Sequence, residues 1–473
     1  MLRGSVAVCG WPAEILVALV VASSSPALGA TENLSLQTLY EFRSNPQNPN
    51  PKNPRAGLTQ GNDGNFYGTT ALGGTNGERG AVFQITPSGL LTLLHSFQGL
   101  DGALPWAGLA QGSDGLWYGT AQGGGTNGDF GVIFQMAGNG EFNVLHHFGG
   151  FDGRSPQAAL VQGNDGSFYG TTAAGGTNLD NGTVFKITPS GVFTSLFSFK
   201  GTNGSRPKAS LVRGVDGNFY GTTSQGGPDY DGASVSGDGT IFRITADGAL
   251  TSLFFFNEIN GSDPEADLVE GSDGNFYGTT QFGGSGADSG TVFKLTPSGT
   301  FTKLYAFSGQ DGSYPLAGLT RDSDGNFYGT TAGDMLSRTN TFGTIFRLTP
   351  AGTLTTLVSF KGSNGASPVA RLCLGNDGNL YGTAFDGGAG DGGTIFRLVE
   401  PLLIKAVAVT NGNVTLTWAS FTHGTYRVEH NPSLTQATWA ALVPEVAATN
   451  TATTITASFE SAIHGFFRIR LLP

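Results

Sequence analysis

The residues best suited to bind a ligand follow a proline that recurs through most of the chain. The residue after this proline differs between copies, whereas the next residue is alanine in all seven copies. In chain order the variable residues are Arg55, Trp106, Gln157, Lys208, Glu265, Leu316 and Val369. A tryptophan ring among charged and amide groups suits a sugar or a peptide, so we take the first five as candidate ligand-binding residues. The alternative is a set of ordinary rim residues around a water-filled channel.

Glu265 also belongs to a possible catalytic pair. Asp267 follows two residues later, and a strand would place both side chains on one side, with about 7 Å between their α-carbons. Glycosidases use two carboxylates at comparable spacing. The chain has no Gly-x-Ser-x-Gly motif and no histidine cluster at zinc-ligand spacing. We therefore assign no catalytic residue and keep a carbohydrate-active enzyme, a glycosidase or lyase, as an alternative.

Aspartates gather in the longest loop of the repeat region, at Asp229, Asp231 and Asp238. The run Asp229-x-Asp231-Gly232 is similar to the start of a calcium-binding loop, although Thr240 stands where a twelve-residue loop has its bidentate glutamate. Calcium is the one cofactor that the sequence suggests. The alternative is that these carboxylates are solvated and keep the protein soluble.

The elements that position these residues belong to one repeated unit. Tyr-Gly-Thr occurs seven times, at Tyr67, Tyr118, Tyr169, Tyr220, Tyr277, Tyr328 and Tyr381. Each unit has four short runs of alternating apolar residues, separated by turn residues such as Asp-Gly, which indicates strands and hairpins. From the glycine of the Gly-Thr-Val-Phe-like segment to the next of these tyrosines the interval is 38 residues every time, so one loop absorbs all length variation. Four-stranded repeats of about 50 residues predict an all-β, seven-bladed β-propeller over residues 31–400.

The ends of the repeat region predict how the ring closes. Residues Leu34 to Phe42 match only the last strand of a unit, and the final unit ends near Leu398 without that strand. We therefore expect the N-terminal strand to complete the last blade, which leaves no open sheet edge.

The first 30 residues have the layout of a secretory signal peptide, with Arg3, an apolar stretch from Ile15 to Ala22, and small residues up to Ala30. We therefore expect a secreted or cell-surface protein. No later run reaches 18 apolar residues, so the sequence predicts no membrane span. The net charge of −11 disfavours nucleic acid and anionic membranes as partners.

Residues 402–473 lack the repeat and show a different pattern of short alternating runs. Trp418, Tyr426 and Phe467 could form the core of a small β-sandwich. This segment resembles a fibronectin type III module.

The repeat itself resembles a known family. Its successive motifs are Pro-x-Ala-x-Leu, Asp-Gly-Asn-Phe-Tyr-Gly-Thr, Gly-Gly, Gly-Thr-Val-Phe, Thr-Pro-x-Gly and Leu-x-x-Phe. This combination resembles the GloVer tandem repeat of bacterial extracellular proteins over about residues 34–400. The resemblance implies secretion or surface display and brings no established reaction or ligand. The strand order is also similar to that of NHL propeller repeats, which implies that the Pro-x-Ala-x-Leu strand lines the central channel.

The sequence thus favours a secreted binding or scaffold protein with an extracellular glycan or protein as its partner. The alternatives are the carbohydrate-active enzyme and a purely structural component of a surface or matrix.

Overall fold

The structure is a computed structural model in which the described residues form only strands, turns and loops. The described residues are 8–11, 14–19, 35–43, 50–75, 77–178, 180–232, 236–284, 286–333, 342–399, 404–410, 413–419, 425–431, 439–442, 444–447, 452–458 and 465–471. The chain divides into two compact units. The larger comprises residues 36–374 and 380–397, and the smaller comprises residues 1–35, 375–379 and 398–473.

The described residues of the larger unit form seven four-stranded antiparallel sheets, which we call blades 1 to 7. Blade 1 consists of β4 (Thr59–Gln60), β5 (Phe66–Thr70), β6 (Ala81–Ile85) and β7 (Leu91–Ser96). Blade 2 consists of β8 (Ala110–Gln111), β9 (Trp117–Ala121), β10 (Val132–Met136) and β11 (Phe142–His147). Blade 3 consists of β12 (Val161–Gln162), β13 (Phe168–Thr172), β14 (Thr183–Ile187) and β15 (Phe193–Ser198).

The remaining blades repeat this order. Blade 4 consists of β16 (Val212–Arg213), β17 (Phe219–Thr223), β18 (Thr240–Ile244) and β19 (Leu250–Phe255). Blade 5 consists of β20 (Val269–Glu270), β21 (Phe276–Thr280), β22 (Thr291–Leu295) and β23 (Phe301–Ala306). Blade 6 consists of β24 (Thr320–Arg321), β25 (Phe327–Thr331), β26 (Thr344–Leu348) and β27 (Leu354–Ser359). Blade 7 consists of β28 (Cys373–Leu374), β29 (Leu380–Ala384), β30 (Asp391–Val399) and β3 (Ser35–Arg43).

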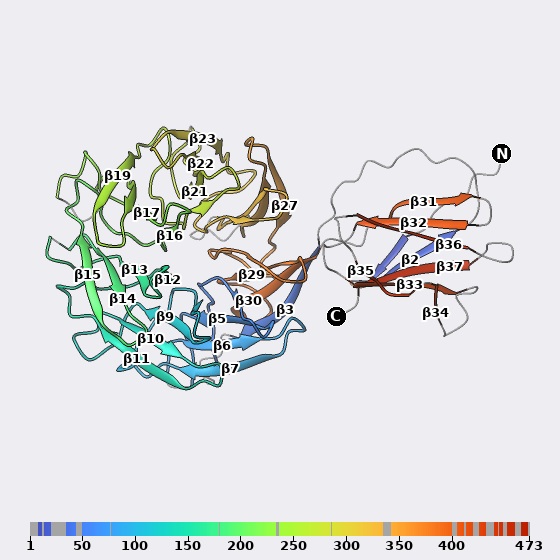
Figure 1. Ribbon diagram of the computed structural model, residues 1–473, viewed down its shortest axis with the longest axis horizontal. Helices are drawn as coiled ribbons and strands as arrows, with labels where there is room; N and C mark the ends of the chain where they lie inside the picture. Colours follow the sequence, from blue (N-terminus) through green and yellow to red (C-terminus); the bar gives the residue numbers. More distant parts are fainter. Residues whose placement is uncertain are drawn as a thin grey trace. The chain divides into compact units, whose positions relative to one another are not determined.

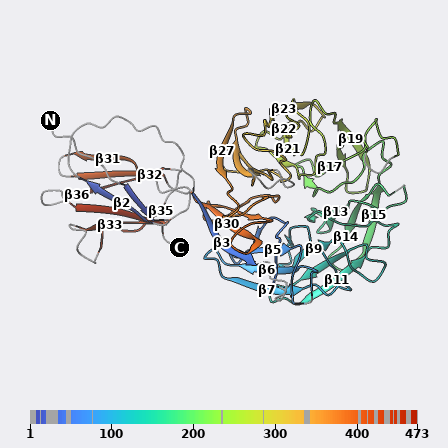
Figure 2. The same cartoon turned by 180° about the vertical axis from the view of Figure 1, so that it is seen from behind.

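The blades are arranged in a ring, with the short first strand of each blade toward the centre and the fourth strand outside (Figure 1). Figure 2 shows the same ring from behind. The second strand is buried along its whole length in blade 3, and the fourth strand is half-exposed. This gradient is expected where each sheet packs between two others. The predicted propeller fold is confirmed.

The ring closes as the two chain ends predict. In blade 7 the sheet order is β28, β29, β30 and then β3, so the N-terminal strand supplies the outermost strand. Phe42 of β3 is buried, and Gln37 of the same strand accepts a 2.6 Å hydrogen bond from the Arg397 guanidinium of β30.

The Asp-Gly turn between the first two strands is built by its own side chains. In blade 3, Asp165 Oδ1 accepts a hydrogen bond from the Ser167 amide at 3.1 Å, and Asp165 Oδ2 accepts one from the Tyr169 hydroxyl at 3.0 Å. Gly166 has φ 77°, which glycine adopts without steric cost. The repeated aspartate therefore orients the tyrosine of Tyr-Gly-Thr.

The glycine of Tyr-Gly-Thr leaves room for the blade core. A Cβ atom at Gly170 would lie 2.6 Å from Phe185 Cζ and 2.8 Å from Leu160 Cδ2. Phe185 is the aromatic residue of the Gly-Thr-Val-Phe-like segment and is fully buried. The two repeated motifs therefore fit together across β13 and β14.

The threonine and the tyrosine of the same motif join neighbouring blades. Thr171 of blade 3 donates a hydrogen bond to the Ala209 carbonyl of blade 4 at 3.0 Å, and Thr383 of blade 7 donates one to the Ala56 carbonyl of blade 1 at the same distance. The tyrosine ring stacks on an aromatic ring of the next blade in blades 1 to 4. The last interface has a similar contact, in which Tyr381 lies 4.0 Å from Phe66.

The smaller unit contains two sheets in its described residues. One has the order β31 (Ile404–Thr410), β32 (Asn413–Ala419), β36 (Ala452–Ser458). The other has the order β1 (Val8–Trp11), β2 (Glu14–Leu19), β37 (Gly465–Leu471), β33 (Thr425–Asn431), β34 (Ala440–Ala441), with β35 (Val446–Ala447) also paired to β33. The buried rings of Trp418 and Tyr426 meet edge to face at 5.6 Å, one from each sheet, as in the expected sandwich. The resemblance to fibronectin type III stays a prediction.

Strands β1 and β2 fall within the segment predicted to be a signal peptide, and β2 pairs with β37 along six residues. Strand pairing does not test cleavage, so the signal peptide stays a prediction. None of the described residues forms a helix with the length and hydropathy of a membrane span.

Candidate functional site

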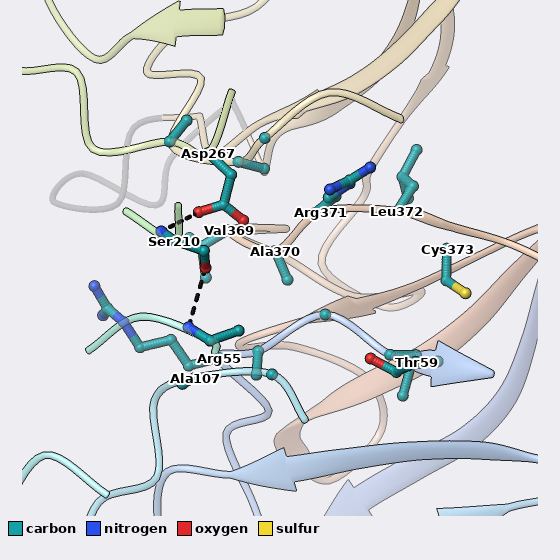
Figure 3. A pocket seen from close by; sticks show the side chains of 18 of the residues that line it. Arg55, Thr59, Ala107, Ser210, Asp267, Val369, Ala370, Arg371, Leu372 and Cys373 are labelled. Atoms are coloured by element: carbon teal, nitrogen blue, oxygen red, sulfur yellow. Dashed lines mark hydrogen bonds between the residues drawn. The ribbon is translucent and has the colours of Figure 1, made fainter. Parts of the chain in front are cut away.

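A cavity of about 520 Å³ lies in the larger unit and is lined by the segments that lead into the first strands of the blades. The five predicted ligand-binding residues all line it, together with Leu316 and Val369. We call these seven the mouth residues. Two positions further along the chain lie the second-ring residues, which also line it: Gly57, Gly108, Ala159, Ser210, Asp267, Gly318 and Arg371. Figure 3 shows Arg55, Ser210, Asp267 and Arg371 around this space.

Each mouth residue is held in place by the residue two positions before it, whose strained backbone the sequence did not reveal. The residue before each repeated proline has a positive φ, from 52° to 58°, although none is glycine: Asn53, Leu104, Ser155, Arg206, Asp263, Tyr314 and Ser367. The Ser155 amide donates to the Phe130 carbonyl of blade 2 at 2.9 Å, and its carbonyl accepts from the Ala173 amide of blade 3 at 3.1 Å. These bonds tie each mouth residue to two blades.

Arg55 and Trp106 form a pair. The Arg55 guanidinium carbon lies 4.1 Å from the centroid of the Trp106 ring, which is a cation–π geometry. Burial lowers the pKa of Arg55, and the charge of Glu265 opposes this only in part. Arg55 therefore covers one face of the ring that the sequence suggested as a stacking platform, and that face is not free for a ligand.

Lys208 and Glu265 form a second pair. The Lys208 ammonium group and a Glu265 carboxylate oxygen make an ion pair, with 23% and 16% of the respective side chains exposed. The second-ring residues beneath them are also bonded. The Ser210 amide donates to Asp267 Oδ1 at 2.6 Å, and the Ala159 amide donates to Ser210 Oγ at 3.0 Å (Figure 3). Both carboxylates of the suggested catalytic pair are thus engaged with neighbouring residues of the protein.

Asp263 is a candidate site residue that the sequence analysis missed. Burial is the main factor that raises its pKa to about 6, and the charge of Glu265 adds to this, whereas Lys208 and Arg206 oppose it. The Ser224 hydroxyl is close enough to lower the pKa, yet Asp263 Oδ1 is buried with no hydrogen bond of normal geometry. Its position directly before the repeated proline was the available signal, but nothing in that position predicts burial.

The predicted calcium ligands lie in the loop between β17 and β18. Burial raises the pKa of Asp238, and the charges of Glu258 and Asp229 raise it further. The Asp231 amide donates to Ser236 Oγ at 3.3 Å. Among the residues that the structure describes, which exclude 233–235 of this loop, no group of three acidic, histidine or cysteine side chains could hold a metal ion. Calcium binding by Asp229, Asp231 and Asp238 stays a prediction.

Solved structures with a similar fold are distant in sequence. One is PorZ, a surface component of the type-IX secretion system of Porphyromonas gingivalis, at 13% identity and a TM-score of 0.48; the match covers 83% of this chain and 53% of PorZ, so this chain spans about half of PorZ. Another is the extracellular domain of the putative hybrid two-component system BT3049 of B. thetaiotaomicron, at 12% identity and a TM-score of 0.46, covering 97% and 58%. A third is the gluconolactonase XC5397 of Xanthomonas campestris, at 14% identity and a TM-score of 0.41, covering 80% and 99%.

No curated protein matches the sequence. The sequence profile of the Gloeobacter/Verrucomicrobia repeat matches it twice, over residues 27–235 and 230–438. Together the two matches cover residues 27–438, which include most of the chain and the whole propeller. The chain therefore belongs to the Gloeobacter/Verrucomicrobia repeat family.

Proposed function

We propose that this protein is an extracellular binding protein whose ligand, a glycan or a protein, enters the propeller channel between the mouth residues. The observation that carries the proposal is the contrast between two adjacent positions in the segment that leads into each first strand. Alanine follows the mouth residue in every blade and serves the blade interface, whereas the mouth residues differ in all seven blades and line one cavity. Secretion is supported by the signal-like first 30 residues.

The cavity has the size and chemistry of a ligand site. About 520 Å³ lies within the range of small-molecule pockets, and the lining combines an aromatic ring with charged and amide groups. The two bonded pairs, Arg55 with Trp106 and Lys208 with Glu265, hold these side chains in defined positions before a ligand arrives. Such preorganisation reduces the entropy lost on binding.

Binding of the full chain to a glycan array and to extracellular proteins tests the proposal. For the ligand identified, Trp106→Ala should weaken binding about 10-fold or more, because it removes a large contact surface and the ring that orients Arg55. Trp439→Ala, in the smaller unit, is the matched control and should bind as the wild type does. Unchanged affinity in the Trp106→Ala variant would contradict a site at the channel mouth.

A carbohydrate-active enzyme is the second candidate, and Asp263 favours it. A carboxyl group with a pKa of about 6 still carries its proton at mildly acidic pH, where an ordinary aspartate is ionised, so Asp263 could act as a general acid there. Turnover of any glycan in the same panel that is lost in both Asp263→Asn and Glu265→Gln would establish the enzyme. Binding without turnover would support the binding protein and contradict the enzyme.

A further inference from the structure

Arg55 is a half-buried cation that forms no ion pair with a carboxylate in the described part of the chain, although the charge of Glu265 acts on it. Its contact is the face of Trp106, and an aromatic face attracts a cation without neutralising it. Lys208, on the same rim, differs because its ammonium group is paired with Glu265. A guanidinium that is partly removed from water and has no anion in direct contact favours an incoming one, to which it presents several donors in one plane.

Among the residues that the structure describes, the backbone amides of Gly57 and Gly108 also have no hydrogen-bond acceptor. In blades 3 and 4 the second-ring amide is capped by a side chain of the next blade, as Ser210 caps Ala159 and Asp267 caps Ser210. In blade 1 the next second-ring residue is Gly108, which has no side chain to cap the Gly57 amide. A Cβ atom at Gly108 would have one neighbour within 4 Å, the Gly57 carbonyl oxygen at 3.5 Å, so this space is open.

The charge of the cavity is opposite to that of the chain. The lining contains four basic residues, Arg55, Lys208, Arg321 and Arg371, and two acidic ones, Glu265 and Asp267. The chain as a whole has a net charge of −11. An electropositive hollow in an acidic protein concentrates anions where the walls exclude water.

The residues beside Arg55 and Trp106 suit hydroxyl groups. Gln157, Lys208 and Glu265 occupy three consecutive blades and offer both donors and acceptors. A sugar ring has hydroxyls around its edge, so it could use all three positions. The C-terminus of a peptide would place its last side chain against the apolar pair Leu316 and Val369. It would leave the three polar positions without partners.

We propose that the ligand is an acidic saccharide, whose carboxylate or sulfate group is held by Arg55 and the free amides of Gly57 and Gly108. This inference rests on the proposed function, because it specifies the ligand of the same mouth. The sugar hydroxyls then bind Gln157, Lys208 and Glu265.

Calorimetric titration of the full chain with trigalacturonate, with its fully methyl-esterified form, and with sulfated and neutral galactose trimers tests the inference. We expect the acid to bind about 10- to 100-fold more tightly than its ester, because esterification removes a charge-assisted hydrogen bond. Preference for the sulfated trimer over its neutral parent would support the proposal with sulfate as the anion. These comparisons need no variant.

Two variants locate the effect. Arg55→Gln should abolish the preference for the charged sugar, and Arg55→Lys should keep part of it because the charge remains. Arg213→Gln removes an exposed arginine of β16 that does not line the cavity, and the preference should persist in it. Thermal unfolding of each variant shows whether it is folded.

Equal binding of charged and neutral sugars, or an unchanged preference in Arg55→Gln, would overturn the inference. Neither result would contradict the proposed binding function. Binding of peptides that is lost when their C-terminus is amidated, with no binding of any saccharide, would overturn the saccharide as ligand. Failure of the wild type to bind any glycan, peptide or protein would count against the proposed function itself.

Discussion

The blade interfaces and the channel mouth are made from adjacent residues of the same segments, yet one is uniform and the other diverse. In blade 4, Lys208 faces the cavity, and the carbonyl of the following residue, Ala209, accepts the hydrogen bond from Thr171 of blade 3. The equivalent threonine donates to this alanine carbonyl in six blades and to the Pro368 carbonyl in blade 6. The small alanine side chain is buried in all seven blades, so the interface position repeats. The mouth position has no such partner and is free to differ. Uniform positions in this repeat therefore mark packing, and diverse ones mark the place where a ligand can be recognised.

One interface departs from the uniform pattern in two places at once. Asp322 stands in blade 6 where each other blade has glycine, and Leu380 stands in blade 7 where the others have phenylalanine or tryptophan. At the equivalent Gly61, a Cβ atom would lie 3.0 Å from both Trp117 of the next blade and Tyr67. A side chain at position 322 thus takes the space that an aromatic residue at position 380 would need. The two differences compensate each other.

Asp263 belongs both to a blade interface and to the surroundings of the channel mouth. Replacing its carboxyl group should have the largest effect on the free energy of unfolding. Its backbone belongs to the blade interface, through bonds to Asp238 and Gln281, and its carboxyl group lies near Glu265 of the mouth. Because the folded-state pKa of about 6 exceeds the value near 4 of an unfolded chain, ionisation of Asp263 favours unfolding. The wild type should therefore lose stability as the pH rises from about 4 to about 6 and remain less stable above that.

Asp263→Asn lacks this ionisable group, and asparagine also tolerates the positive φ. The variant should match the wild type at pH 4 and exceed its free energy of unfolding by about 1–3 kcal/mol at pH 7.5. Urea unfolding at the two pH values measures the difference. Parallel stability curves for the two proteins would show that Asp263 is not held in a raised-pKa environment.

Substitutions at the irregular interface between blades 6 and 7 should change the free energy of unfolding less than Asp263→Asn does. Leu380→Phe alone should destabilise the protein, because the new ring meets the Asp322 side chain. Adding Asp322→Gly should restore the regular contact with Tyr328 and recover the loss, with a further gain of up to about 1 kcal/mol from the aromatic pair. Asp322→Gly alone serves as the control for the cycle. Additive effects of the two substitutions would contradict the compensation between these positions.

The sequence predicted the fold well because the repeat exposes the packing pattern seven times over. The constant interval of 38 residues and the lone strand at the N-terminus were sufficient for the blades and their closure. The diversity after the proline also predicted that Arg55, Trp106 and Glu265 line one space.

The interactions within the site were not predictable in the same way. Arg55 and Trp106 are 51 residues apart, and only the angle between two blades brings the guanidinium over the ring. The burial of Asp263 likewise depends on loops from two blades. A pattern within one unit shows which way a residue faces, but it does not show which neighbour the residue meets there.

Urea unfolding of two variants from one blade tests most directly the division between interface and mouth. Thr171→Val removes the buried hydrogen bond to the Ala209 carbonyl at nearly constant volume, and Gln157→Ala shortens a mouth side chain for which the described structure shows no hydrogen bond. The account predicts a loss of about 1–2 kcal/mol for Thr171→Val and a change within about 0.5 kcal/mol for Gln157→Ala. Equal losses for both, or a larger loss for Gln157→Ala, would contradict it.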